Sequence, residues 1–130
     1  MTEEQDWRDK LSPEEYRICR EKATEPPFSG EYNDNPRKGS YRCKCCGEIL
    51  FDSTNKYDSG SGWPSFDRPA GDDRIHYEED SSFGMRRVEV SCDRCGCHLG
   101  HVFEDGPRQT TGKRYCINSL SLDFTEQVDE

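Results

Sequence analysis

Cys43-Lys44-Cys45-Cys46-Gly47 and Cys92-Asp93-Arg94-Cys95-Gly96 are two copies of one pattern, C-x-x-C-G. This spacing lets a tight turn direct two thiolates at one tetrahedral ion, and the glycine suits the turn because it tolerates positive φ. Two copies supply four sulfur ligands, which closes the coordination sphere and leaves no position for a substrate. We therefore expect one structural zinc ion that joins two distant hairpins, held by Cys43, Cys46, Cys92 and Cys95.

The same pattern allows a second interpretation, because C-x-x-C also occurs in proteins that exchange thiols and disulfides. A pair of redox-active dithiols is therefore the alternative to zinc. Cys45 and Cys97 lie beside the expected ligands, but the doubled pattern selects the other four cysteines. We expect Cys45 and Cys97 to be turn residues with no ligand role.

The 130-residue chain has 30% hydrophobic content, which suits one small domain with a thin core that benefits from a metal. Its formal net charge of -9 opposes the phosphate neutralisation that nucleic-acid binding requires. Residues 1–20 are highly charged and no run has membrane-spanning length, so we expect no secretory signal and no membrane contact. The expected location is the cytoplasm, where thiols stay reduced; an extracellular disulfide scaffold is the less favoured alternative.

Short apolar runs alternate with turn residues along most of the chain, which is typical of a small antiparallel β domain. The expected strands are 41–43, 48–51, 87–92, 101–103 and a longer one at 114–124. One helix is expected near the N-terminus, with Ser12 as its cap, Pro13 as its first residue and Glu15 completing a capping box. It should end before Pro26, because proline lacks an amide donor and restricts the residue before it.

Cys116 stands apart from the metal motifs, in the segment Arg114-Tyr115-Cys116-Ile117-Asn118. If this segment is a strand, Arg114, Cys116 and Asn118 share one face. The guanidinium of Arg114 should lower the pKa of Cys116 and favour the nucleophilic thiolate, and Asn118 could donate a hydrogen bond to a polar substrate atom. The alternative is that Cys116 is an unreactive buried cysteine.

Two histidines and one tryptophan are further site candidates. His98 and His101 directly follow the second cysteine pair, so a metal-bound turn would fix their positions, and an imidazole can supply a general acid near neutral pH. Trp63 lies in a glycine-rich loop, where its ring could form the wall of a pocket for a methyl group. Each has a structural alternative: hydrogen-bonded or surface histidines, and a tryptophan that anchors the loop together with Phe66. His76 has no partner motif.

Five motifs in this order resemble those of the B-type peptide-methionine (R)-S-oxide reductases: Cys43-x-x-Cys46, Gly62-Trp63-Pro64-Ser65-Phe66, Cys92-x-x-Cys95, His98-x-Gly100-His101-Val102-Phe103 and Arg114-Tyr115-Cys116-x-Asn118-Ser119. The upstream stretch 24–30 also matches. The resemblance implies a mainly β fold of two small antiparallel sheets, clipped by one zinc ion remote from the chemistry, with a peripheral N-terminal helix or helices. It covers residues 11–124, which we expect to form a single domain between a flexible N-terminus (1–10) and an acidic tail (125–130).

The resemblance also implies an activity, the reduction of the R epimer of methionine sulfoxide, preferably in proteins or peptides. By motif position Cys116 is the nucleophile, which attacks the sulfoxide sulfur and becomes a sulfenic acid, while His98 or His101 protonates the oxygen. The other implied site residues are Asn118 and Arg114, which act with Cys116, and Trp63, Phe103 and Asp105 at the substrate. We expect a monomer.

Ser61 marks a departure from the commoner family pattern, which has a resolving cysteine at this position. The usual disulfide with Cys116 therefore cannot form here. Cys19, in the expected helix and outside both cysteine pairs, is the candidate alternative resolving thiol, unless it packs in the core. Direct reduction of Cys116 by thioredoxin or a small thiol is the other route. The rival to an enzyme is a non-catalytic zinc-ribbon binding module, in which Cys116 is structural.

Overall fold

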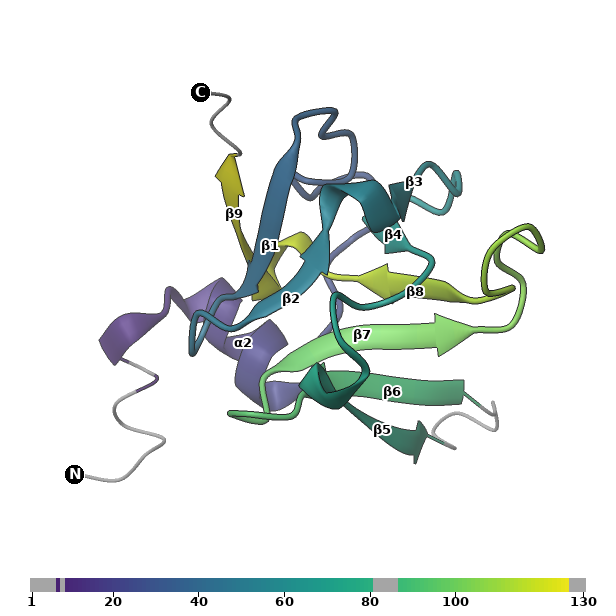
Figure 1. Cartoon of the computed structure of the whole chain (residues 1–130). Coiled ribbons are helices and arrows are strands. Elements are labelled where there is room, and N and C mark those ends of the chain that lie inside the picture. Colours follow the sequence, from purple (N-terminus) through teal and green to yellow (C-terminus); the bar gives the residue numbers. More distant parts are fainter. Residues whose placement is uncertain (1–6, 8, 81–86, 127–130) are drawn as a thin grey trace.

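A computed structural model describes residue 7 and residues 9–80 and 87–126. In these ranges the chain forms a three-stranded sheet of order β2-β1-β9 and a six-stranded sheet of order β3-β4-β8-β7-β6-β5, and all neighbouring strands are antiparallel (Figure 1). The expected mainly β fold of two antiparallel sheets is confirmed. The strands are β1 (Gly39–Cys43), β2 (Ile49–Asp52), β3 (Lys56–Tyr57), β4 (Ser65–Phe66), β5 (Ile75–Asp80), β6 (Arg87–Cys92), β7 (His98–Phe103), β8 (Arg114–Ile117) and β9 (Leu122–Glu126).

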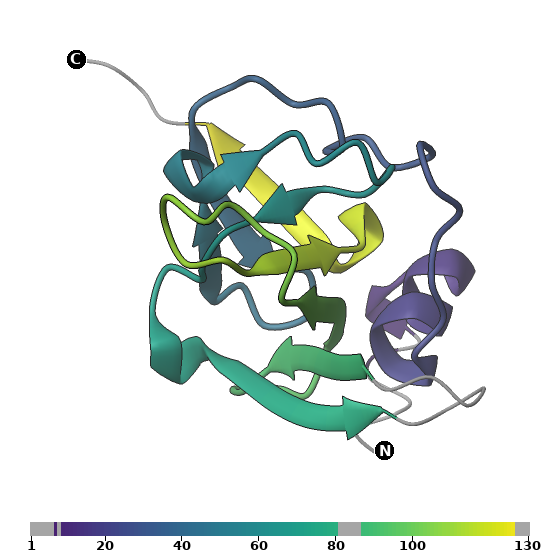
Figure 2. The same cartoon turned by 90° about the vertical axis from the view of Figure 1, so that its right-hand side faces the viewer.

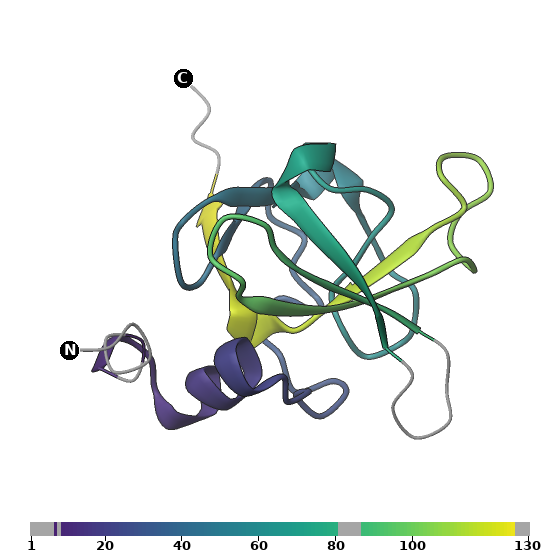
Figure 3. The same cartoon turned by 90° about the horizontal axis from the view of Figure 1, so that it is seen from below.

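Helix α2 (Pro13–Glu21) lies outside the sheets and packs against β7 and the turn Ser119–Ser121 (Figures 2 and 3). It begins as the sequence predicts: the Glu15 amide donates to Ser12 Oγ at 3.2 Å, and the Ser12 amide donates to the Glu15 carboxylate at 2.9 Å. Lys22 ends the helix in the left-handed conformation, ahead of the prolines. Tyr16 and Cys19 are buried on its inner face.

The two cysteine-pair turns have the same backbone design. Gly47 and Gly96 have φ values of 81° and 80°, which glycine adopts without the steric cost that other residues incur. The Gly47 amide donates to the Cys43 carbonyl at 2.9 Å, and the Gly96 amide donates to the Cys92 carbonyl at 2.8 Å. Each turn closes a hairpin, β1–β2 in the small sheet and β6–β7 in the large one.

The strand expected at 114–124 is in fact two strands in different sheets. Strand β8 pairs with β7 and β4, whereas β9 pairs with β1. A 3₁₀ turn, Ser119–Ser121, separates them, and it forms because the Ser121 amide and hydroxyl both donate to the Asn118 carbonyl, at 3.1 and 2.7 Å. Strand β9 continues to Glu126, which pairs with Gly39, so it extends two residues into the segment expected as tail.

Three strands were not expected from the sequence. Strand β5 is an edge strand whose residues from His76 to Glu79 are exposed, so it lacks the alternation of apolar and polar residues that marks a half-buried strand. Strands β3 and β4 have two residues each, which is too short for any periodic pattern.

Aromatic rings from both sheets form the core. Phe51 of β2 stacks on Phe66 of β4, with ring centroids 4.3 Å apart, and Tyr41 of β1 meets Phe66 edge-on at 5.1 Å. Tyr115 of β8 lies 5.9 Å from Phe51. These contacts attach the small sheet to β4 and to β8, and β8 carries the candidate nucleophile Cys116.

The chain ends lie mostly outside the described residues. Of the segment expected as a flexible N-terminus (1–10), Trp7, Asp9 and Lys10 are described, and the Arg20 guanidinium lies 5.0 Å from the centre of the Trp7 ring. Of the expected acidic tail, residues 127–130 are not described. Within the described ranges, no helix combines the length and apolar character needed to cross a membrane.

Replacing Phe51 with alanine should destabilise the protein by about 3–5 kcal/mol, because the substitution removes a fully buried ring and leaves a cavity between the sheets. Urea unfolding of the metal-loaded protein measures the difference. The control is Phe28→Ala, which removes a ring that is 71% exposed and should change the free energy of unfolding by no more than about 0.5 kcal/mol. Equal effects of the two substitutions would contradict this assignment of the core.

Candidate active site

Cys116 opens into a cavity of about 270 Å³ that is also lined by Arg114, on the same face of β8, and by Asn118, which directly follows the strand. The expected alternation along this strand is confirmed, because Tyr115 and Ile117 are buried on the other face. The described residues that line the cavity are Thr24, Ser61, Trp63, Arg87, Gly100, His101, Phe103, Arg114, Cys116 and Asn118.

Strands β7 and β8 bring His101 directly opposite Cys116 in the sheet. This pairing depends on Gly100, where an added Cβ would lie 2.0 Å from the Cys116 carbonyl oxygen. Only glycine permits so close an approach of the two backbones. The motif glycine therefore sets the separation between the thiol and the imidazole.

The electrostatics of Cys116 differ from the sequence-based expectation. Burial raises the pKa of the thiol above its usual value, although a hydrogen bond with Ser61 and the charge of Arg114 act in the opposite direction. The Ser61 hydroxyl lies 3.6 Å from Cys116 Sγ. The contribution of Arg114 has the predicted sign, but the predicted net lowering of the pKa is wrong because burial outweighs it.

Arg114 is held beside the cavity by two neighbours. Its Nε and Nη2 donate to the two carboxylate oxygens of Asp105, at 2.9 and 3.2 Å, and its guanidinium carbon lies 4.5 Å from the centre of the Phe103 ring. Asp105 itself is exposed and does not line the cavity. Of the three residues expected at the substrate, Trp63 and Phe103 line the cavity, whereas Asp105 holds Arg114.

His101 is bound to an acidic residue that the sequence did not single out. Its Nε2 donates to Asp80 Oδ2 at 3.0 Å, and Arg87 Nη2 donates to the same oxygen at 3.2 Å. The carboxylate fixes which ring nitrogen carries the proton and compensates a positive charge on the ring. Asp80 is the last residue of the edge strand β5 and follows Glu78 and Glu79. In the sequence it therefore cannot be distinguished from ordinary acidic surface residues.

His98 lies behind the cavity and is not among its described lining. It is 3% exposed, and its Nδ1 donates to the Ile18 carbonyl of α2 at 3.2 Å. Burial lowers the pKa of His98, which favours the neutral ring. A register shift between Val90 and Ser91 puts an extra residue of β7 against β6, and such a bulge redirects side chains; the rings of His98 and His101 lie 6.0 Å apart.

Asn118 and Trp63 line the cavity, and the side chains of both are hydrogen-bonded to the backbone of Glu25. The Glu25 amide donates to Asn118 Oδ1 at 3.0 Å, and Trp63 Nε1 donates to the Glu25 carbonyl at 2.9 Å. Asn118 Nδ2 donates to the Leu99 carbonyl at 3.0 Å, which leaves one amide hydrogen for a ligand. Glu25 is buried, and burial raises the pKa of its carboxyl.

The four cysteines expected as metal ligands come together. Their sulfur atoms all lie within 4.8 Å of one another, and the pairs Cys43–Cys95 and Cys46–Cys92 are 3.5 and 3.6 Å apart. A tetrahedral ion with metal–sulfur bonds of about 2.3 Å separates its ligands by about 3.8 Å. The four thiols, from one hairpin of each sheet, are therefore arranged to hold a metal ion. This four-thiol group is not part of the Cys116 cavity.

Cys19, Cys45 and Cys97 form a second group of sulfur atoms within 4.8 Å of one another. All three side chains are almost completely buried. Cys45 and Cys97 lie in the two turns, as expected, but their sulfur atoms point inward to Cys19 of the helix, a contact that the sequence did not indicate. Cys19 is not among the described residues that line the Cys116 cavity.

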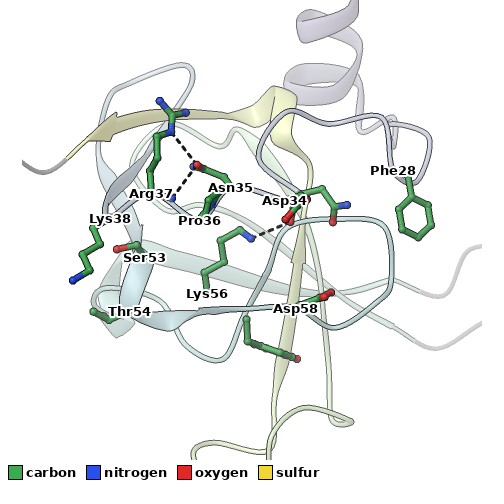
Figure 4. A pocket seen from close by; sticks show the side chains of 12 residues that line it. Phe28, Asp34, Asn35, Pro36, Arg37, Lys38, Ser53, Thr54, Lys56 and Asp58 are labelled. Atoms are coloured by element: carbon green, nitrogen blue, oxygen red, sulfur yellow. Dashed lines mark hydrogen bonds between the residues drawn. The ribbon is translucent and has the colours of Figure 1, made fainter.

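A larger hollow, of about 820 Å³, lies next to β3 and the segment 33–38 (Figure 4). Its described lining includes no cysteine or histidine. Lys56 Nζ donates to the Asn33 carbonyl at 3.0 Å, and Arg37 Nε donates to Asn35 Oδ1 at 3.0 Å. Because it offers neither a nucleophile nor an imidazole, the smaller cavity at Cys116 is the better candidate for catalysis.

The fold, the four-thiol group and the cavity agree with the comparison to known families. Residues 11–126 match the family described as the SelR domain. The chain belongs to this family, whose members related to it carry the name "Peptide methionine sulfoxide reductase MsrB".

Relatives with this name come from distant organisms. The protein of Chromohalobacter salexigens is 58% identical over 93% of this chain and 91% of the relative, and that of Cellvibrio japonicus is 60% identical over 94% and 87%. The protein of Methanosarcina mazei is 55% identical over 97% and 89%. A solved structure described as the Mis18 "Yippee-like" domain covers 72% of this chain and 100% of its own, with a TM-score of 0.57 and 19% identity. At that identity the likeness concerns the fold alone.

Replacing Arg114 with glutamine should raise the pKa of Cys116 further, because the substitution removes the cation that favours the thiolate. The pH profile of Cys116 alkylation by iodoacetamide should move to higher pH, and the rate at pH 8 should fall several-fold. The rate is followed by peptide mass spectrometry. The control is Arg108→Gln, which removes the same charge from an exposed residue outside the cavity; an equal shift in both variants would contradict a local effect of Arg114.

Proposed function

We propose that this MsrB-family protein reduces the R epimer of methionine sulfoxide in proteins and peptides, with Cys116 as the nucleophile. The observation that carries the proposal is the cavity itself, which brings a thiol, an imidazole and an indole ring together. The names of the relatives support the reaction, and the resemblance of the motifs to the R-specific reductases supports the epimer.

The chemistry begins with the Cys116 thiolate, which attacks the sulfoxide sulfur. The sulfoxide oxygen accepts a proton and is transferred to Cys116, so that methionine leaves and a sulfenic acid remains. Sulfur of the substrate is reduced by two electrons and sulfur of Cys116 is oxidised by two. Arg114 and Ser61 favour the thiolate that burial disfavours.

His101 is the residue that we propose as the proton donor. Its position opposite Cys116 and its bond to Asp80 support this role, because the carboxylate compensates the charge of an imidazolium. His98 donates to α2 and lies outside the described lining. We therefore propose that His98 orients β7 next to His101, and that Asn118 uses its remaining amide hydrogen to bind the sulfoxide oxygen.

The size and lining of the cavity support a side chain as substrate. Pockets for whole drug-sized ligands usually exceed about 300 Å³, and this cavity, at about 270 Å³, is slightly smaller. Trp63 and Phe103 offer apolar ring surface for the methyl group and the methylene stem of methionine. The expectations of a cytoplasmic location, no nucleic-acid partner and a monomeric state are part of this proposal.

We also propose that the four-thiol group of Cys43, Cys46, Cys92 and Cys95 holds one zinc ion. Four sulfur donors at tetrahedral spacing are typical of structural zinc sites. When bound, the ion supplies no chemistry to the substrate and ties the β1–β2 and β6–β7 hairpins together. Its binding free energy contributes to the stability of the fold.

Regeneration of Cys116 requires a second thiol, because the sulfenic acid must be condensed to a disulfide and then reduced. Ser61, whose hydroxyl lies 3.6 Å from Cys116 Sγ, cannot supply one. Cys19, the other candidate, is buried beside Cys45 and Cys97, so it would have to leave the core. We therefore favour direct reduction by thioredoxin or a small thiol.

Replacing Cys116 with serine should lower the reduction of R-methionine sulfoxide by at least about 1,000-fold, since the nucleophile is lost. The assay uses separated R and S epimers of a peptide substrate, with and without thioredoxin. The S epimer should react with neither protein. Zinc content and far-ultraviolet circular dichroism of the variant serve as controls for folding.

The same experiment tests the rival function, a non-catalytic zinc-ribbon binding module. Wild-type protein that binds zinc but reduces neither epimer would support the rival and contradict the enzyme. Reduction of the S epimer in place of R would retain the reaction and reject the stereochemistry.

Replacing Ser61 with cysteine should create a disulfide to Cys116, because the side chains already lie 3.6 Å apart and a small rotation brings two sulfurs to bonding distance. After one turnover without reductant, the variant should lose two thiols, and peptide mapping should find the 61–116 link. Wild-type protein should keep a sulfenic acid that dimedone traps. Thr110→Cys, which adds an exposed thiol outside the cavity, is the control; a Cys19–Cys116 disulfide in the wild type would contradict direct regeneration.

A further inference from the structure

Three cysteines that the proposed reaction does not use lie together at the buried face of α2. Cys19 comes from the helix, Cys45 from the β1–β2 turn and Cys97 from the β6–β7 turn, and their sulfur atoms all lie within 4.8 Å of one another. Their side chains are 0%, 1% and 0% exposed. Three separate segments thus contribute one buried thiol each to a single cluster.

Ordinary core packing accounts for a single buried cysteine, but two further features suit three thiolates around a soft cation, an arrangement with excess negative charge. The three donors are all sulfur, and three is the coordination number that a soft monovalent ion accepts. The neighbours are cationic: Lys10 Nζ donates to the Cys45 carbonyl and Arg20 Nη1 donates to the Cys95 carbonyl at 3.1 Å.

We propose that Cys19, Cys45 and Cys97 form a second metal site, which takes a soft, thiophilic monovalent cation of the Cu(I) type. Thiolates select such ions over hard cations. Binding deprotonates the three thiols and leaves two net negative charges, which the side chains of Lys10 and Arg20 balance. A zinc ion prefers four ligands, and a fourth sulfur would have to be taken from the four-thiol group.

The place of this three-thiol site gives it a structural consequence. Figures 1 and 3 show α2 on the side of the molecule where the β1–β2 and β6–β7 turns lie. The residue before Cys19 is Ile18, whose carbonyl accepts the hydrogen bond from His98. An ion bound to the three thiols would fasten α2 to both turns and hold this hydrogen bond in place.

The test is an anaerobic titration of the full chain, already loaded with one zinc ion, with Cu(I) buffered by bathocuproine disulfonate. Native mass spectrometry should show one copper bound per chain with the zinc retained. Cys19→Ser should weaken copper binding by at least about 10-fold, since loss of a ligand costs no less than the 10- to 100-fold loss that follows removal of a ligand's hydrogen-bond partner. Cys116→Ser, which removes a thiol outside the site, should bind copper as the wild type does.

Three results would overturn the proposal: copper that enters only as zinc leaves, equal copper affinity in Cys19→Ser and wild type, or a second zinc ion bound in preference to copper. Circular dichroism and zinc content show whether Cys19→Ser folds. If it does not, X-ray absorption at the copper edge of the wild-type protein decides the question, because three sulfur neighbours support the site and any other first shell rejects it.

Discussion

The meeting of four thiols at the ends of two hairpins is the constraint on which the rest of the structure depends. The β1–β2 hairpin belongs to the small sheet and the β6–β7 hairpin to the large one, yet their sulfur atoms lie within 4.8 Å of one another. Each turn is preset by a glycine at positive φ, Gly47 or Gly96. Because β7 begins directly after the second turn, the meeting of the four thiols also determines where β7 lies beside β8.

The candidate site is built at a close approach of β7 and β8. Gly100 permits the approach, and the pairing then sets His101 opposite Cys116. The segment around Glu25 closes the cavity from the other side, because its backbone binds both Asn118 and Trp63. The side chains of Asn118 and Trp63, far apart in the sequence, are thus held by hydrogen bonds to one stretch of main chain, and such supporting bonds fix the geometry of a site.

Burial and charge act against each other at Cys116. Burial raises the pKa of the thiol, and Arg114 and Ser61 offset only part of this effect. A raised pKa lowers the thiolate fraction at a given pH and therefore the reactivity of the thiol. The nucleophilicity of Cys116 thus depends on Arg114 and Ser61, the two groups that act against burial.

The sequence alone determined the metal-ligand pattern, the capped helix and the strand that carries Cys116, because spacing, capping and alternation are local properties of a chain. It could not determine that Asp80 binds His101, that His98 turns toward α2, or that Cys19 joins Cys45 and Cys97. Only the tertiary structure decided these, since each depends on two segments that meet after the sheets have formed. The direction of the pKa shift of Cys116 also required the tertiary structure, because burial is a property of the whole fold.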